Sequence, residues 1–93
     1  MNTYEIIDER VAVACSFLTQ DALSLCRPAK MRWRQHTITF CELGLRHPTT
    51  KGQRMIHVFD MSDGSNDYRL EFDAEALTWT LAAVSQGALH AAS

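Results

Sequence analysis

Three cations alternate with apolar side chains in one short segment, and this is the part of the chain best suited to binding a ligand. Lys30, Arg32 and Arg34 are separated by Met31 and Trp33. On a strand, alternate side chains share a face and lie about 6.6–7 Å apart. The cations would then form a line that can follow phosphates along a nucleic-acid backbone.

The residues predicted to bind nucleic acid or a protein partner are Arg27, Lys30, Arg32 and Arg34. His36 follows close by. The alternative is that the row is solvated, or paired with Glu71 and Asp73 on the outer face of a later strand. Nine Lys and Arg residues against eleven Asp and Glu give a net charge of −2. This balance favours the alternative over nucleic-acid binding.

The spacing of the other reactive residues gives little indication of a metal site, a calcium-binding loop or a catalytic site. The three cysteines, Cys15, Cys26 and Cys41, lie far apart, and no Cys-x-x-Cys or His-x₃-His pair occurs. The acidic run Asp60–Asp67 lacks the spacing of a calcium-binding loop. No nucleophile elbow or glycine-rich phosphate loop is present. We therefore expect no catalytic residues, no cofactor and no metal, and a protein that is not an enzyme.

The cysteines and the amino-terminal segment bear on the compartment. An odd number of cysteines in apolar or strand-like runs is typical of reduced, buried thiols in a cytosolic protein. The first residues lack the basic start of a secretion signal, and no run approaches the roughly 20 apolar residues that span a bilayer. We expect a cytoplasmic protein without membrane contact.

Ninety-three residues, 46% of them hydrophobic, suffice for one core and one domain, 1–93, with an ordered part from about 9 to 85. A chain this short gains from burying another face in an oligomer. The strand predicted at Arg54–Met61 is apolar on both faces, which is typical of a central or partner-covered strand. Both observations favour a homodimer.

Alternation of apolar and polar side chains predicts most of the strands. Arg10–Leu18 fits a strand, but a helical stripe also fits, so residues 5–18 stay open between the two. The remaining predicted strands are Ala22–Cys26, Lys30–Arg34, Thr37–Arg46, Arg54–Met61, Tyr68–Asp73 and Leu77–Ala83. Trp33 and Trp79 fall on the apolar faces of their strands and are predicted to lie in the core.

Turn chemistry separates these strands. We expect turns at Thr19–Asp21, Gln35–His36 and Ser62–Asn66, a β-bulge near Cys41–Glu42, and a polar loop at His47–Gln53. The tail Ser85–Ser93 either frays or forms a short terminal helix.

The segment Arg27–Phe40 resembles a small bacterial family of unknown function that carries a proline, a Trp-Arg-Gly-Arg hairpin and an aromatic-x-aliphatic strand. A later Trp-x-Leu element is matched by Trp79-Thr80-Leu81, so the resemblance covers about residues 9–85. Gln35 and His36 replace the family's glycine and arginine, and Ile38 replaces its usual tyrosine. The resemblance implies a β-rich fold and no particular activity.

Several short strands joined by turns predict a mainly β fold, a small antiparallel meander that forms an open barrel or roll, or a sandwich. The predicted function is that of a non-catalytic domain acting through protein–protein contacts, including self-association. The alternative is a nucleic-acid-associated accessory domain that uses the basic strand face.

Overall fold

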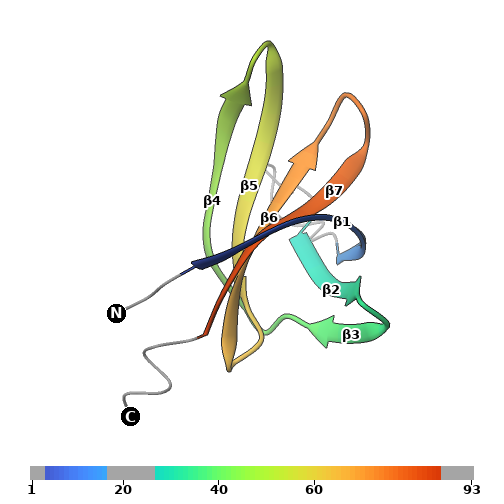
Figure 1. The fold of residues 1–93 in the computed structure, drawn as a ribbon, viewed down its shortest axis with the longest axis vertical. Coiled ribbons are helices and arrows are strands. Elements are labelled where there is room, and N and C mark those ends of the chain that lie inside the picture. Colours follow the sequence, from blue (N-terminus) through green and yellow to red (C-terminus); the bar gives the residue numbers. More distant parts are fainter. Residues whose placement is uncertain (1–3, 17–26, 87–93) are drawn as a thin grey trace.

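The computed structural model describes residues 4–16 and 27–86. All regular elements in this part of the chain are strands, joined by short turns (Figure 1). They are β1 Tyr4–Ser16, β2 Arg27–Trp33, β3 His36–Thr39, β4 Glu42–Lys51, β5 Arg54–Ser62, β6 Asn66–Asp73 and β7 Thr78–Gln86. The predicted turn Thr19–Asp21, the strand Ala22–Cys26 and most of the Ser85–Ser93 tail lie outside the described residues.

All seven strands belong to one antiparallel sheet with the order β3-β2-β1-β7-β6-β5-β4. The prediction of a mainly β antiparallel meander is confirmed. The sheet is not closed into a barrel, because β3 and β4 are its two unpaired edges. These edges are nevertheless consecutive in the chain, and Phe40 and Cys41 carry the backbone directly from one to the other.

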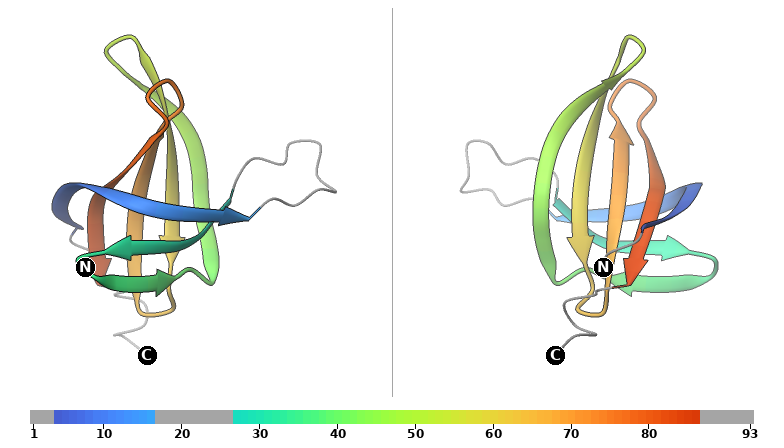
Figure 2. Two further views of the ribbon diagram at one scale, coloured as in Figure 1. Left: turned by 90° about the vertical axis from the view of Figure 1, so that its right-hand side faces the viewer. Right: turned by 60° about the vertical axis from the view of Figure 1, so that its left-hand side comes forward.

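Strand β1 joins the two halves of the sheet. Residues Tyr4–Val11 pair with β7, and Ala12–Ser16 pair with β2. The register shifts between Ile6 and Glu9, where Asp8 has a φ of 54°. Such bulges bend and twist a strand. As a result β1, β2 and β3 run crosswise over one face of β4–β7, which we call the inner face (Figure 2, left). Residues 5–18 were predicted as either a strand or a helix, and their described part, up to Ser16, is a strand.

The core lies between these two layers. Its buried members are Val11, Met31, Phe40, Phe59, Met61, Tyr68, Leu70 and Leu81. Met31 comes from the crossing hairpin and is only 1% exposed. Trp33 and Trp79 are partly buried and pack against this cluster from opposite layers. Their predicted inward orientation is therefore confirmed.

Strand β5 is buried on both faces within a single copy of the chain. Phe59 belongs to the core, and Val58 is buried on the opposite, outer face. Lys51 on β4 bonds Glu71 on β6 at 2.7 Å, so its side chain crosses the outer face of β5. The prediction of a central strand is correct, and its burial does not require a partner.

Two predictions around β4 are wrong. Thr37–Arg46 is not one strand, because the chain leaves β3 at Thr39 and begins β4 at Glu42; the bulge lies between Leu43 and Leu45. The predicted loop His47–Gln53 is mostly strand, since β4 continues to Lys51. Pro48 is tolerated because an edge strand has a side that needs no ladder hydrogen bond.

The Ser62–Asn66 turn is confirmed and is organised by Asp63. Its carboxylate accepts hydrogen bonds from the N–H groups of Ser65 and Asn66, and from the Tyr68 hydroxyl at 2.8 Å. Burial alone would raise the pKa of Asp63, but these donors outweigh it and lower that pKa below its usual value. Burial raises the pKa of Tyr68 to about 12.

The β2–β3 turn lies one residue earlier than predicted. Arg34 and Gln35 form it with φ values of 50° and 66°, and His36 is already in β3 opposite Trp33. Two consecutive positive φ values are typical of a type I′ turn, in which glycine or asparagine is favoured. The sequence offers neither, which is why its pattern placed the turn wrongly.

The Gln35→Gly substitution should stabilise the protein by about 0.5–1 kcal/mol. An L-residue such as glutamine pays about 1–2 kcal/mol to adopt the left-handed backbone conformation with positive φ. Glycine adopts it without strain but loses roughly 0.5–1 kcal/mol more in chain entropy on folding. The reverse change, Gly52→Gln, is a matched control because Gly52 has a φ of 64° and open space around it. It should lower the stability by a similar amount. Urea unfolding measures both, and a destabilised Gln35→Gly protein would contradict the assigned turn.

Met31→Ala should cost about 2–5 kcal/mol, because it opens a cavity between the crossing hairpin and the sheet. Leu45→Ala is the control: this side chain is 54% exposed and lies outside the core, so its truncation should cost less than about 1 kcal/mol. Equal losses in urea unfolding would show that the hairpin does not pack on the sheet as described.

Candidate functional site

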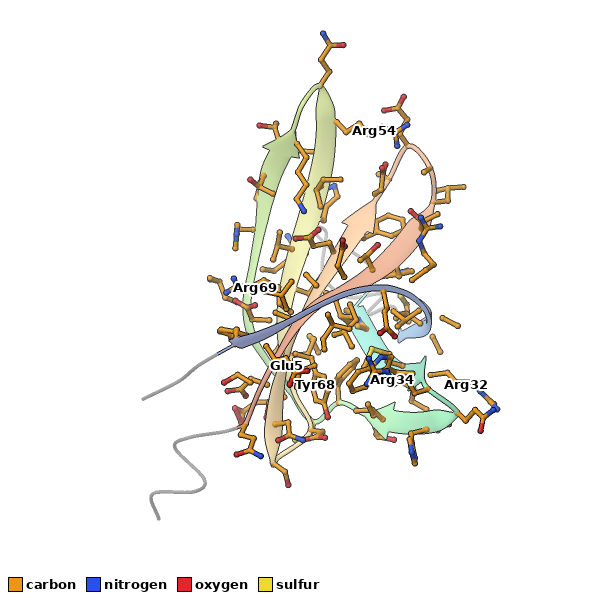
Figure 3. All side chains as sticks on the ribbon, in the orientation of Figure 1. Glu5, Arg32, Arg34, Arg54, Tyr68 and Arg69 are labelled. Carbon is orange, nitrogen blue, oxygen red and sulfur yellow. The ribbon has the colours of Figure 1, made fainter. Side chains whose placement is uncertain are left out.

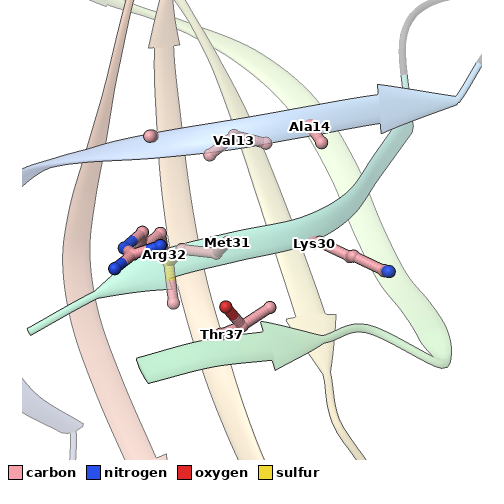
Figure 4. A pocket seen from close by; sticks show the side chains of 7 residues that line it. Val13, Ala14, Lys30, Met31, Arg32 and Thr37 are labelled. Atoms are coloured by element: carbon pink, nitrogen blue, oxygen red, sulfur yellow. The ribbon is translucent and has the colours of Figure 1, made fainter. Parts of the chain in front are cut away.

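The predicted basic strand face exists, but with different members. Lys30 and Arg32 are exposed on β2, and Met31 and Trp33 between them point into the core, as the alternation predicted. Lys30 and Arg32 border an open groove of about 320 Å³ that runs over β1, β2 and β3 (Figure 4). We call this outer surface of the three strands the β2 face.

Small or hydroxyl side chains flank the cations on the neighbouring strands. Ala12 of β1 and Thr37 of β3 lie opposite Arg32. Lys30 lies between Ala14 and Thr39 in the same way. All four neighbours are exposed. The cations therefore stand on a surface where a ligand can approach the sheet closely.

Arg10 also belongs to the β2 face, although it was absent from the predicted set. On β1, Arg10, Ala12 and Ala14 share one side, while Val11 and Val13 contact the core on the other. Arg10 is exposed. The alternation around Val11 and Val13 carried the signal, but the sequence did not show that β1 and β2 are neighbours.

Arg34 does not belong to the β2 face. Its Nη2 donates to Glu9 Oε2 at 2.6 Å, and its guanidinium stacks on the Trp33 ring at 4.7 Å from the centroid. The Trp33 indole N–H donates to the same carboxylate at 3.0 Å. The predicted row of three cations fails at Arg34, because the turn ends the strand alternation there.

The hydrogen bond from Arg34, followed by the one from Trp33, lowers the pKa of Glu9. The same contact with Glu9 raises the pKa of Arg34. Both changes favour the charged forms, and they hold the hairpin turn against β1.

The predicted alternative, pairing of the basic row with Glu71 and Asp73, is not what the structure shows. Glu71 bonds Lys51, and Asp73 bonds Arg54, which lies at the far end of the sheet from Arg32 and Arg34 (Figure 3). Within residues 4–16 and 27–86, neither Lys30 nor Arg32 takes part in an ion pair. Arg27 begins β2, and its side chain lies outside the described part; His36 is exposed.

A second hollow of about 290 Å³ lies on the outer face beside β4. Two of its lining residues, Tyr4 and Asp60, also hold Arg69, which lies 4.9 Å from the centre of the Tyr4 ring and donates to Asp60 at 2.9 Å. Burial, and after it the charge of Asp60, raises the pKa of Tyr4. The cation beside this hollow, Arg69, is thus already paired with Asp60.

The inner face of β4–β7 offers an apolar surface beyond β1. Phe72 and Trp79 stack there with ring centroids 4.8 Å apart, on neighbouring strands. Met55 follows the same alternation as Phe59 and is half exposed. None of the described strands crosses this end of the sheet (Figure 2, left). We call Met55, Phe72 and Trp79 the upper inner surface.

The cysteines depart from the sequence prediction. Cys15 is disulfide-bonded, so the expectation of three reduced thiols is wrong; the sequence alone gives no distances between cysteines. Cys41 is a free, exposed thiol. Among the residues that the structure describes, no three His, Cys, Asp or Glu side chains are grouped so as to hold a metal ion.

Comparisons of the chain with protein-family models, curated proteins and solved structures give no match. The resemblance of Arg27–Phe40 to a bacterial hairpin family therefore stays a prediction. In the described part of the chain, no helix is long and apolar enough to cross a membrane.

The assignment of Arg34 rather than Arg32 to Glu9 can be checked by titration. In the wild-type protein, NMR should give a Glu9 pKa below 4.5, the ordinary value. Arg34→Gln should raise this pKa towards 4.5, because it removes the main donor. Arg32→Gln, one alternation away, should leave it unchanged. Because the folded pKa is lowered, the contribution of Glu9 to stability is complete above pH 4.5 and is lost as pH falls through the lowered value.

Proposed function

We propose that this domain is a non-catalytic binding module that acts through protein contacts, including contacts with a second copy of itself. The observation that supports it is the upper inner surface, where stacked aromatic rings and a half-exposed methionine remain beyond the crossing strands. Aromatic and methionine side chains are enriched in the cores of protein interfaces. Methionine also adapts its shape to different partners.

The proposal places the contact on a face of the sheet rather than on an edge. The long edge strand β4 carries a bulge after Leu43, and Pro48 interrupts its row of backbone donors. The other edge, β3, has only four residues. Short edges, bulges and prolines all disfavour strand-to-strand association.

Self-association is the part of the proposal that the size of the domain favours. A chain of 93 residues buries a smaller fraction of its surface than a large protein, so covering a further apolar surface is a larger relative gain. The outer face of β5 is not the surface for this, because Ile56 and Val58 are already buried there within one copy. Of β5, only Met55 on the inner face belongs to the upper inner surface.

The cytoplasmic location also stays a prediction. The disulfide at Cys15 is an observation against this location, because disulfides form and persist mainly in oxidising compartments.

Met55→Lys should weaken the dimer at least tenfold, because association would bury a charge in an apolar contact. Ile6→Lys is the matched control: Ile6 is 76% exposed and lies near the β1 bulge, away from Met55. It should change the dimer constant less than about twofold. Sedimentation equilibrium over a range of protein concentrations measures both.

A wild-type protein that stays monomeric at millimolar concentration would remove self-association from the proposal. An Ile6→Lys effect as large as that of Met55→Lys would contradict the choice of surface.

A further inference from the structure

The β2 face is a second surface, distinct from the upper inner surface, and it carries a group of exposed cations. Arg10, Lys30 and Arg32 are exposed on it. No Asp or Glu lines the groove between these strands. The net charge of −2 therefore hides a local positive surface.

Four of the five other cations whose side chains the structure describes are paired, and the exception is Arg46, which stands alone on β4. Arg34, Lys51, Arg54 and Arg69 are each bonded to a carboxylate within the protein. Their charges are already neutralised in the folded state. Those on the β2 face have no such partner among residues 4–16 and 27–86, so they are available to an external anion.

The spacing of the β2 face suits a linear anion. Lys30 and Arg32 are two residues apart on a regular strand, which places them about 6.6–7 Å from each other. Arg10 continues the surface on the neighbouring strand. The Thr37 and Thr39 hydroxyls opposite the cations can donate further hydrogen bonds to anionic oxygens. A chain of phosphates fits this arrangement better than one compact anion does.

We propose that the β2 face binds the phosphodiester backbone of a nucleic acid, single-stranded or duplex, without reading its sequence. The aromatic side chain of this hairpin, Trp33, packs towards the core and under Arg34, so bases find no stacking platform on the β2 face. The contacts are therefore to phosphates alone. The binding is weak and depends strongly on salt.

The test measures binding of a fluorescent 20-nucleotide oligo(dT) by anisotropy at 50 and 200 mM salt. Three neutralised phosphates on a single strand predict a slope of about −2 in log affinity against log salt, or roughly a 20-fold loss between these concentrations. No binding at 50 mM salt, or a slope near zero, overturns the proposal.

Arg32→Glu should reduce the affinity at least tenfold at 50 mM salt. The matched control is Arg46→Glu, which makes the same charge change at an exposed cation of β4. It should stay within about twofold of the wild type, as should Arg34→Gln, because Arg34 is bound to Glu9. Circular dichroism confirms that each variant is folded. Equal losses for Arg32→Glu and Arg46→Glu overturn the proposal, because they indicate a response to net charge only.

Two further arms identify the ligand. A duplex of the same length and inorganic polyphosphate are measured under the same conditions. Binding of both oligo(dT) and the duplex, each weakened by Arg32→Glu, supports the proposal, whereas binding of polyphosphate alone overturns it. Arg32→Glu should leave the dimer constant unchanged, and Met55→Lys should leave oligo(dT) binding unchanged, so the two proposals fail independently.

Discussion

The hydrogen bonding of β1 to both β7 and β2 is the constraint on which the rest of the structure depends. A strand that serves two layers has to bend, and the bend is made at the bulge beside Asp8. It brings the β2–β3 hairpin over the inner face and places Met31 in the core. Without it, β4–β7 would expose the whole of that face to water.

This arrangement also decides which surfaces are left for function. The crossing hairpin covers one end of the inner face and leaves the end at the β6–β7 turn free of described strands. Phe72 and Trp79 lie beside this turn, at the end of β6 and the start of β7. The outer side of the same hairpin becomes the β2 face. One geometric feature thus generates an apolar surface and a cationic one, on different sides of the chain, which can bind different partners.

Ion pairs within the protein determine which cations remain available to bind an external ligand. Glu9, Asp60, Glu71 and Asp73 each take one partner. These contacts are largely exposed, so their value for stability is small. Their larger effect is to neutralise four cations elsewhere. The described cations that remain unpaired are Arg10, Lys30 and Arg32 on the β2 face and the isolated Arg46 on β4.

The amino-acid sequence by itself determined the strands with strict alternation, β2, β6 and β7, and the inward direction of Trp33 and Trp79. Alternation acts between neighbours along the chain, so it can be seen without tertiary contacts. It failed at β4, where Pro48 and polar residues are typical of a loop, and at Arg34, where a turn without glycine broke the pattern.

Only the tertiary structure decided which charges meet and which surfaces stay open. Arg34 and Glu9 are 25 positions apart, and Lys51 and Glu71 are 20 apart. Such pairs depend on strand order and register, which long-range packing fixes. For the same reason Arg10 joined the basic face and Arg34 left it.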